Sequence, residues 1–249
     1  MLSQIIWSSS IVLEVLLLIR GWSRGLLRRY PIFYGYVCFV LLQELPLYAA
    51  HQRGEVAYWW TYWTFEYLGV AAGCAMVFEI YKIALDGYPG AARIVRNVLM
   101  FVFSMVFAKG LANGVKVNHA WDKATAFGTE RMVRTVQGVA IIALVILFLV
   151  YAIPFGKNLR GILLGYSLFI AARIICLTFV APQGHDFWFY ATPAFYVAVL
   201  SLWVAHLWSY HPVPVAQTRG NLERDYRIVA AATQRRFRET AGLVRRAVR

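Results

Sequence analysis

Stretches of about twenty mostly apolar residues recur along this chain, and they constrain its fold more than any other feature. A helix of that length spans the hydrocarbon core of a bilayer, because each residue adds about 1.5 Å. We identify seven such stretches, which cover residues 2–19, 31–50, 57–85, 94–111, 133–153, 161–181 and 187–210. They predict an all-α, polytopic membrane protein with seven transmembrane helices.

The composition excludes an ordinary soluble domain. Of the 249 residues, 60% are hydrophobic and 15% are charged, whereas soluble domains contain about 45–50% apolar and about 25% charged residues. A soluble protein of this length could not bury so much apolar surface, so lipid must solvate much of it. We therefore predict two parts, a membrane bundle over residues 1–210 and a cytoplasmic tail over residues 211–249.

The distribution of positive charge predicts the orientation. Most of the 25 Lys and Arg residues lie in the first, third and fifth loops and in the tail. Positively charged loops stay in the cytoplasm, so the N-terminus is expected outside and the C-terminus inside. Membrane topology also accounts for the net charge of +13, and we expect no nucleic-acid partner.

The tail has the pattern of a basic amphipathic helix. Apolar residues such as Leu222, Val229 and Phe237 recur every three or four positions, with arginines beside them. Such a helix can lie on the anionic lipids of the inner leaflet. Docking onto a membrane or cytoplasmic protein partner is the alternative.

Ionisable side chains inside the predicted spans are few. A charge at mid-membrane costs about 2.5–3.5 kcal/mol, so these groups should face the bundle interior and find partners there. They are Glu14, Glu44, Glu66, Glu79, Arg173 and His206. Their depths predict an outer layer, in which Arg173 pairs with Glu66 or Glu44 near Gln43, and an inner layer of Glu79, Glu14 and His206.

The outer layer allows two interpretations. Arg173 lies roughly 18 Å above the cytoplasmic end of its span, and an arginine–carboxylate pair suits a medium of low dielectric constant. The pair could simply tie helices together. It could also line a polar pocket for a small ligand or an ion, because two carboxylates against one arginine leave a surplus acid.

Catalytic signatures are missing from the sequence. The last span has no lysine for a Schiff base, and the chain has no clustered histidines and no glycine-rich phosphate loop. The three cysteines, Cys38, Cys74 and Cys176, lie within spans at no metal-binding spacing. We expect no enzyme activity, no metal and no cofactor.

Two patches carry a resemblance. RRYPIFYGYVCF (28–39) and YWTFEYLGVAAGCAMVFEIYKIAL (62–85) resemble segments of bacterial seven-helix membrane proteins that have no assigned activity. The resemblance implies a multi-pass protein of the bacterial inner membrane. For function we expect a receptor-like binding or sensing module that acts through a partner. A small-solute transporter and an accessory subunit of a larger membrane complex are the alternatives.

Overall fold

The computed structural model describes residues 2–116, 123–151, 156–183, 185–210 and 228, and every regular element within them is a helix. The helices are α1 (Leu2–Ser23), α2 (Leu26–Arg29), α3 (Pro31–Gln52), α4 (Glu55–Ala84), α5 (Pro89–Lys116), α6 (Lys123–Tyr151), α7 (Lys157–Gln183) and α8 (His185–Leu207). The predicted tail helix lies outside the described residues, apart from Ile228.

Six helices contain segments that are long and apolar enough to cross a membrane: α1, α3, α4, α5, α6 and α7. In α8 the apolar segment is the shorter Ala191–Leu207. The all-helical prediction is therefore confirmed for the described residues, and the six candidate spans agree with a multi-pass membrane protein. The seventh span and the orientation stay predictions.

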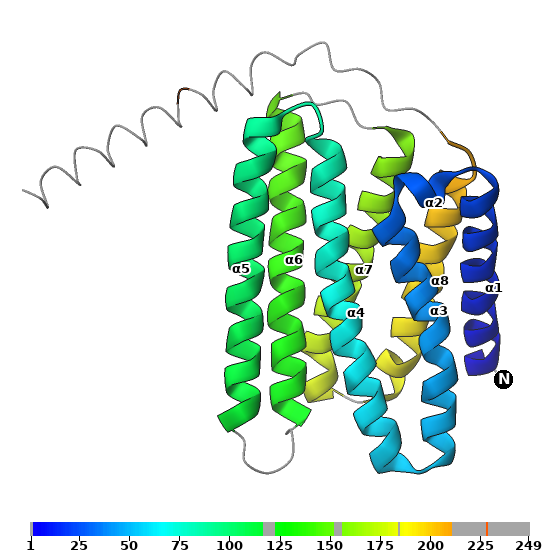
Figure 1. Ribbon diagram of the computed structural model, residues 1–249. Coiled ribbons are helices and arrows are strands. Elements are labelled where there is room, and N and C mark those ends of the chain that lie inside the picture. The colour runs from blue at the N-terminus through cyan, green and yellow to red at the C-terminus, as the bar shows by residue number, and fades with distance from the viewer. Residues whose placement is uncertain (1, 117–122, 152–155, 184, 211–227, 229–249) are drawn as a thin grey trace, which may run out of the picture.

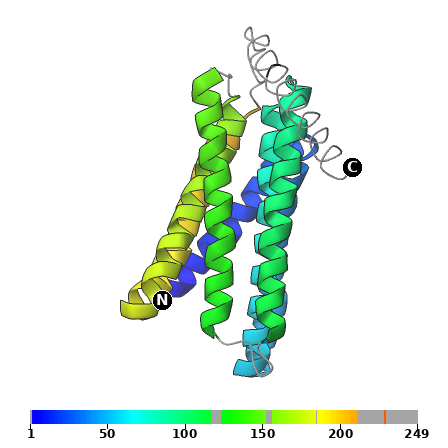
Figure 2. The same cartoon turned by 90° about the vertical axis from the view of Figure 1, so that its left-hand side faces the viewer.

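The long helices run in alternating directions along one axis (Figure 1). Six of them form a ring in which neighbours pack in the order α1, α3, α4, α6, α7, α8 and back to α1. Helix α5 packs outside this ring, against α4 and α6, as Figures 1 and 2 show.

Short turns fix the order of the first helices. Gly25 precedes α2 with φ of 67°, and Gly54 joins α3 to α4 with φ of 112°. Both values lie in a region that glycine adopts without steric cost.

Pro31 begins α3, where its missing N–H would have no helical partner in any case. The connections at 24–30 and 85–88 lie at the same end of the bundle (Figure 1), which we call the basic end.

Two polar side chains clamp neighbouring helices near the basic end. The carboxylate of Glu79 on α4 accepts hydrogen bonds from the backbone amides of Ile32 and Phe33, each at 2.8 Å, and so caps the start of α3. Asn158 on α7 donates to the carbonyls of His206 and Ser209, at 3.2 and 2.8 Å, at the end of α8. Each clamp satisfies backbone groups that a helix end leaves open.

Helices α7 and α8 pack closely because glycines face large side chains. A Cβ added at Gly165 would lie 2.2 Å from Nε1 of Trp203, and one at Gly161 would lie 2.3 Å from Cβ of His206. Trp203 is fully buried and donates its indole N–H to the carbonyl of Ile162 at 3.3 Å. These contacts leave no room for a side chain at either glycine.

Large apolar side chains point away from the bundle. Phe101 on α5, Leu149 on α6 and Leu45 on α3 are 69%, 77% and 71% exposed. Exposed apolar residues on successive helices are expected where lipid is the solvent. This surface agrees with contact to the bilayer.

Helix α6 differs most from its prediction, since it begins at Lys123 rather than at residue 133. Its first half contains Glu130, Arg131 and Arg134, whose charges lower the hydropathy of this segment. Two of these side chains, Glu130 and Arg134, are buried in the bundle.

Candidate functional site

Four charged side chains meet where α4, α6 and α7 approach one another. Oε1 of Glu66 on α4 lies 2.9 Å from Nη2 of Arg134 on α6 and 2.9 Å from Nη2 of Arg173 on α7. Glu130 on α6 accepts from Nε of Arg173 at 3.1 Å and also contacts Nη2 of that residue. Nε of Arg134 lies 3.6 Å from Oε1 of Glu130, one helical turn away. We call these four residues the charged quartet.

The charged quartet is buried and balanced. Glu130 and Arg134 are 1% and 2% exposed, and the side chains of Arg173 and Glu66 are 13% and 17% exposed. Two guanidinium groups face two carboxylates, so the ionised quartet carries no net charge. Balance of this kind is what allows charges to stay inside a membrane bundle.

Some hydrogen-bonding capacity in the charged quartet is unused. Nη1 of Arg134 and Oε2 of Glu130 are buried and have no hydrogen-bond partner among the described residues. The Arg134 guanidinium also lies 5.2 Å from the ring centroid of Phe169. A buried donor without a partner is costly, and such groups commonly bind an unseen water or ligand.

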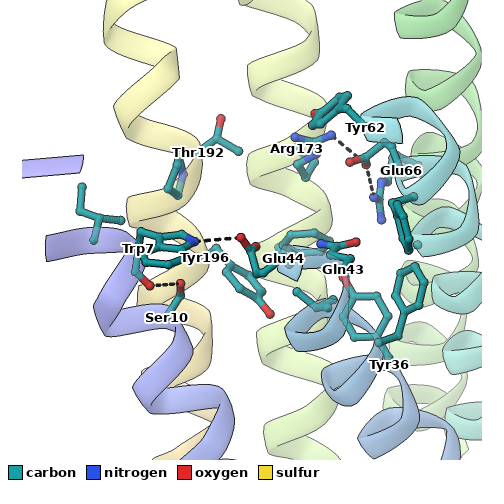
Figure 3. A pocket seen from close by; sticks show the side chains of 18 of the residues that line it. Trp7, Ser10, Tyr36, Gln43, Glu44, Tyr62, Glu66, Arg173, Thr192 and Tyr196 are labelled. Atoms are coloured by element: carbon teal, nitrogen blue, oxygen red, sulfur yellow. Dashed lines mark hydrogen bonds and ion pairs between the residues drawn. The ribbon is translucent and has the colours of Figure 1, made fainter. Parts of the chain in front are cut away.

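A cavity of about 560 Å³ lies inside the ring of helices, beside the charged quartet. All six ring helices contribute to its lining. The residues are Ile6, Trp7, Ser10, Tyr36, Phe39, Val40, Gln43, Glu44, Tyr58, Tyr62, Phe65, Glu66, Gly69, Arg134, Phe169, Arg173, Thr192, Pro193 and Tyr196. Eight of these 19 residues are aromatic and seven are polar or charged, and Figure 3 shows both kinds facing the same space. Volume and lining are those of a site for a small molecule.

Glu44 supplies the other carboxylate of the cavity, but it is not the partner of Arg173. Its Oε2 accepts a hydrogen bond from Nε1 of Trp7 at 2.8 Å. Figure 3 shows Glu44 beside Trp7 and Tyr196, while Arg173 and Glu66 form a separate group. Of the two partners that the sequence allowed for Arg173, the structure places Glu66 in contact with it. Gln43 lines the cavity as well.

The residues predicted as an inner layer have separate partners. Glu14 accepts from the hydroxyl of Tyr196 at 2.8 Å. Glu79 caps α3, and Nδ1 of His206 lies 3.0 Å from the carbonyl of Leu202 in its own helix. Among the described residues, no hydrogen bond or ion pair joins any two of these three side chains.

Gln137 on α6 forms hydrogen bonds to α4 and α7 in the buried core next to the cavity. Its Nε2 donates to the carbonyl of Val70 at 3.0 Å and lies 3.1 Å from Sγ of Cys74. Its Oε1 accepts from the hydroxyl of Tyr166 at 3.3 Å. Gln137 and Tyr166 are fully buried. Packed side chains thus occupy the bundle next to the cavity on the side toward the basic end.

Two residues of the charged quartet escaped the sequence analysis. Arg134 lies at the very start of the predicted span 133–153 and Glu130 lies before it, so neither is among the predicted intramembrane charges. The structure has two carboxylates against two arginines, so the predicted surplus acid beside Arg173 is wrong. One signal was available. Glu130 and Arg134 are four residues apart, a spacing at which opposite charges meet on one face of a helix.

No family model, no curated protein and no solved structure is significantly similar to this chain. The resemblance to bacterial seven-helix proteins therefore stays a prediction.

Proposed function

We propose that this protein is a multi-pass membrane module that binds a small polar molecule within its helical ring and acts through a partner protein. The observation that carries the proposal is the cavity of about 560 Å³, lined by charged and aromatic residues from six helices. Pockets of roughly 300–1,000 Å³ with aromatic walls and a few polar groups are typical of small-molecule sites.

The charged quartet has a feature that a purely structural link between helices would not need, and this feature supports ligand binding. A tie between helices needs only satisfied pairs, whereas Nη1 of Arg134 lacks a partner among the described residues and belongs to a side chain that lines the cavity. A ligand with a hydrogen-bond acceptor would satisfy this donor. Binding would then also stabilise the junction of α4, α6 and α7.

The proposal includes the orientation of the protein in the membrane. Arg20, Arg24, Arg28 and Arg29 lie in or beside the connection at 24–30, and Arg93 and Arg96 lie in the first turns of α5, after the connection at 85–88. The positive-inside rule assigns such an end to the cytoplasm. The cavity would then open toward the outer side, as expected for a module that detects external molecules. The bacterial inner membrane is the location that follows from the resemblance of the sequence.

A small-solute transporter is the second candidate. It would need a continuous polar path from the cavity to the basic end, past Glu79. Buried side chains such as Phe33, Tyr166 and Trp203 lie in that region, each less than 1% exposed, which favours a closed site over an open path. Solute flux in proteoliposomes that depended on both Glu66 and Glu79 would favour the transporter instead.

Native mass spectrometry of the protein in mild detergent tests the proposal. We expect wild-type protein to retain a small molecule and the variants Arg173→Gln and Glu44→Gln to lose it. Glu55→Gln is the control, because Glu55 is an exposed carboxylate in the first turn of α4, outside the cavity lining. Wild-type protein that carried no small molecule but a stoichiometric protein partner would contradict ligand binding and favour an accessory subunit.

A further inference from the structure

The cavity has two chemically different ends. The charged quartet on α4, α6 and α7 is neutral overall but presents Arg134 and Arg173 to the cavity. The other end contains Glu44, held by the indole N–H of Trp7. Figure 3 shows these groups separated within the same site. Both ends line the same cavity of about 560 Å³.

Glu44 has no positive partner in the described part of the chain. Every ion pair found there belongs to the charged quartet, and the only hydrogen bond to the Glu44 carboxylate comes from the neutral Trp7. A half-buried carboxylate inside a membrane bundle is stabilised by a counter-charge. A cationic group on the ligand would supply that counter-charge.

Aromatic rings surround this carboxylate. Trp7, Tyr58 and Tyr196 line the cavity together with Glu44. A cation near aromatic ring faces is stabilised by their electron density, and tryptophan and tyrosine are the preferred rings for organic ammonium ions. Aromatic walls around a carboxylate favour an ammonium group over a hydrated metal ion, which prefers oxygen ligands.

The arginine end presents a hydrogen-bond donor without a partner among the described residues, although the charged quartet is balanced in charge. Nη1 of Arg134 is buried without a hydrogen-bond partner in the described structure, and Arg134 is 2% exposed. Guanidinium groups bind carboxylates with strong, directional hydrogen bonds. An acceptor on the ligand would use this donor without disturbing the bonds from Glu66.

We infer that the ligand is a small zwitterion, with an ammonium group at Glu44, a carboxylate at Arg134 and Arg173, and an apolar body against the aromatic walls. The inference rests on the proposed binding function and names the class of its ligand. A counter-charge at Glu44 together with a charge-assisted hydrogen bond at Arg134 favours a zwitterion over an ion of either single charge.

Matched probes test each end. L-Phenylalanine and 4-(aminomethyl)benzoate are zwitterions that separate the two charges differently. Phenethylamine and 4-methylbenzylamine lack the carboxylate, 3-phenylpropanoate and 4-methylbenzoate lack the ammonium group, and 4-methylbenzyl alcohol is neutral. Calorimetric titration of the full chain in detergent gives the Kd of each. We expect at least one zwitterion to bind about tenfold or more tighter than both of its singly charged analogues.

Variants test which end of the cavity binds which charged group of the ligand. Glu44→Gln should remove the advantage of the zwitterion over the matched anion, Glu44→Asp should retain part of it, and Glu55→Gln should leave it unchanged. An anion that binds wild-type protein as tightly as its zwitterion would overturn the role of Glu44. An amine that does so would overturn the role of the arginines.

The outcomes also separate this inference from the proposed function. If only the neutral alcohol bound, and a cavity substitution such as Phe65→Ala abolished its binding, the zwitterion inference would be wrong. The proposed small-molecule site would still stand. If no probe bound and native mass spectrometry found no retained molecule, both proposals would be wrong.

Discussion

Replacing Glu66 with glutamine should strongly destabilise the bundle. The carboxylate accepts one hydrogen bond from each of two buried guanidinium groups, both at 2.9 Å. Without its charge, Glu130 alone would face Arg134 and Arg173. Breaking a buried pair by removing one partner costs about 3–5 kcal/mol, because an uncompensated charge is left inside. We expect a loss near 3 kcal/mol for Glu66→Gln, since glutamine keeps one acceptor oxygen.

A double-mutant cycle separates this charge effect from lost packing. Arg134→Met removes one guanidinium group, and combined with Glu66→Gln it leaves Glu130 paired with Arg173 in a neutral site. The double variant should therefore lose about 2 kcal/mol less than the sum of the single variants, within the usual range for coupled neighbours.

Equilibrium unfolding in mixed micelles of dodecylmaltoside and SDS, followed by circular dichroism, gives the free energies of unfolding. Glu55→Gln serves as the control for loss of one carboxylate from an exposed position on α4. Additive effects, within about 0.5 kcal/mol, would refute the argument that the charged quartet acts as one balanced unit.

Three further substitutions test the packing and the clamps. Glu79→Ala should cost on the order of 3 kcal/mol in unfolding free energy, because two amides at the start of α3 lose their acceptor. Gly165→Ala should lower the unfolding temperature, since its Cβ would meet Trp203 at 2.2 Å; Gly35→Ala, with nothing within 4 Å, should not. Tyr81→Phe should cost about 1 kcal/mol in the same unfolding assay through loss of its 2.6 Å hydrogen bond to a backbone carbonyl.

The general architecture could be predicted because hydropathy is a local property. Runs of apolar residues need lipid wherever they fold, so six membrane-type helices could be recognised in advance. The interior position of Arg173 followed from the same logic, since a charge in such a run must face the bundle.

The partners of Arg173 could not be predicted in full, because they depend on packing between distant segments. Glu130 and Arg134 count against a membrane span in any sum over neighbouring residues, yet Glu66 and Arg173 neutralise them in the folded protein. For the same reason Glu79 could not be recognised as a cap: its acceptor role depends on where α3 begins, 47 residues away for Ile32. Hydropathy says nothing about such pairings.

The contacts of α1 have a consequence for the rates of ligand exchange. At the level of the cavity, α4, α6 and α7 are joined by ionic hydrogen bonds, whereas the polar contacts of α1 with α3 and α8 are single bonds from neutral donors, Trp7 to Glu44 and Tyr196 to Glu14. Opening along α1 therefore has the lower free-energy barrier. We expect the residence time of a bound molecule to follow the local unfolding of α1, and its amides to exchange with deuterium fastest among the helices that enclose the cavity.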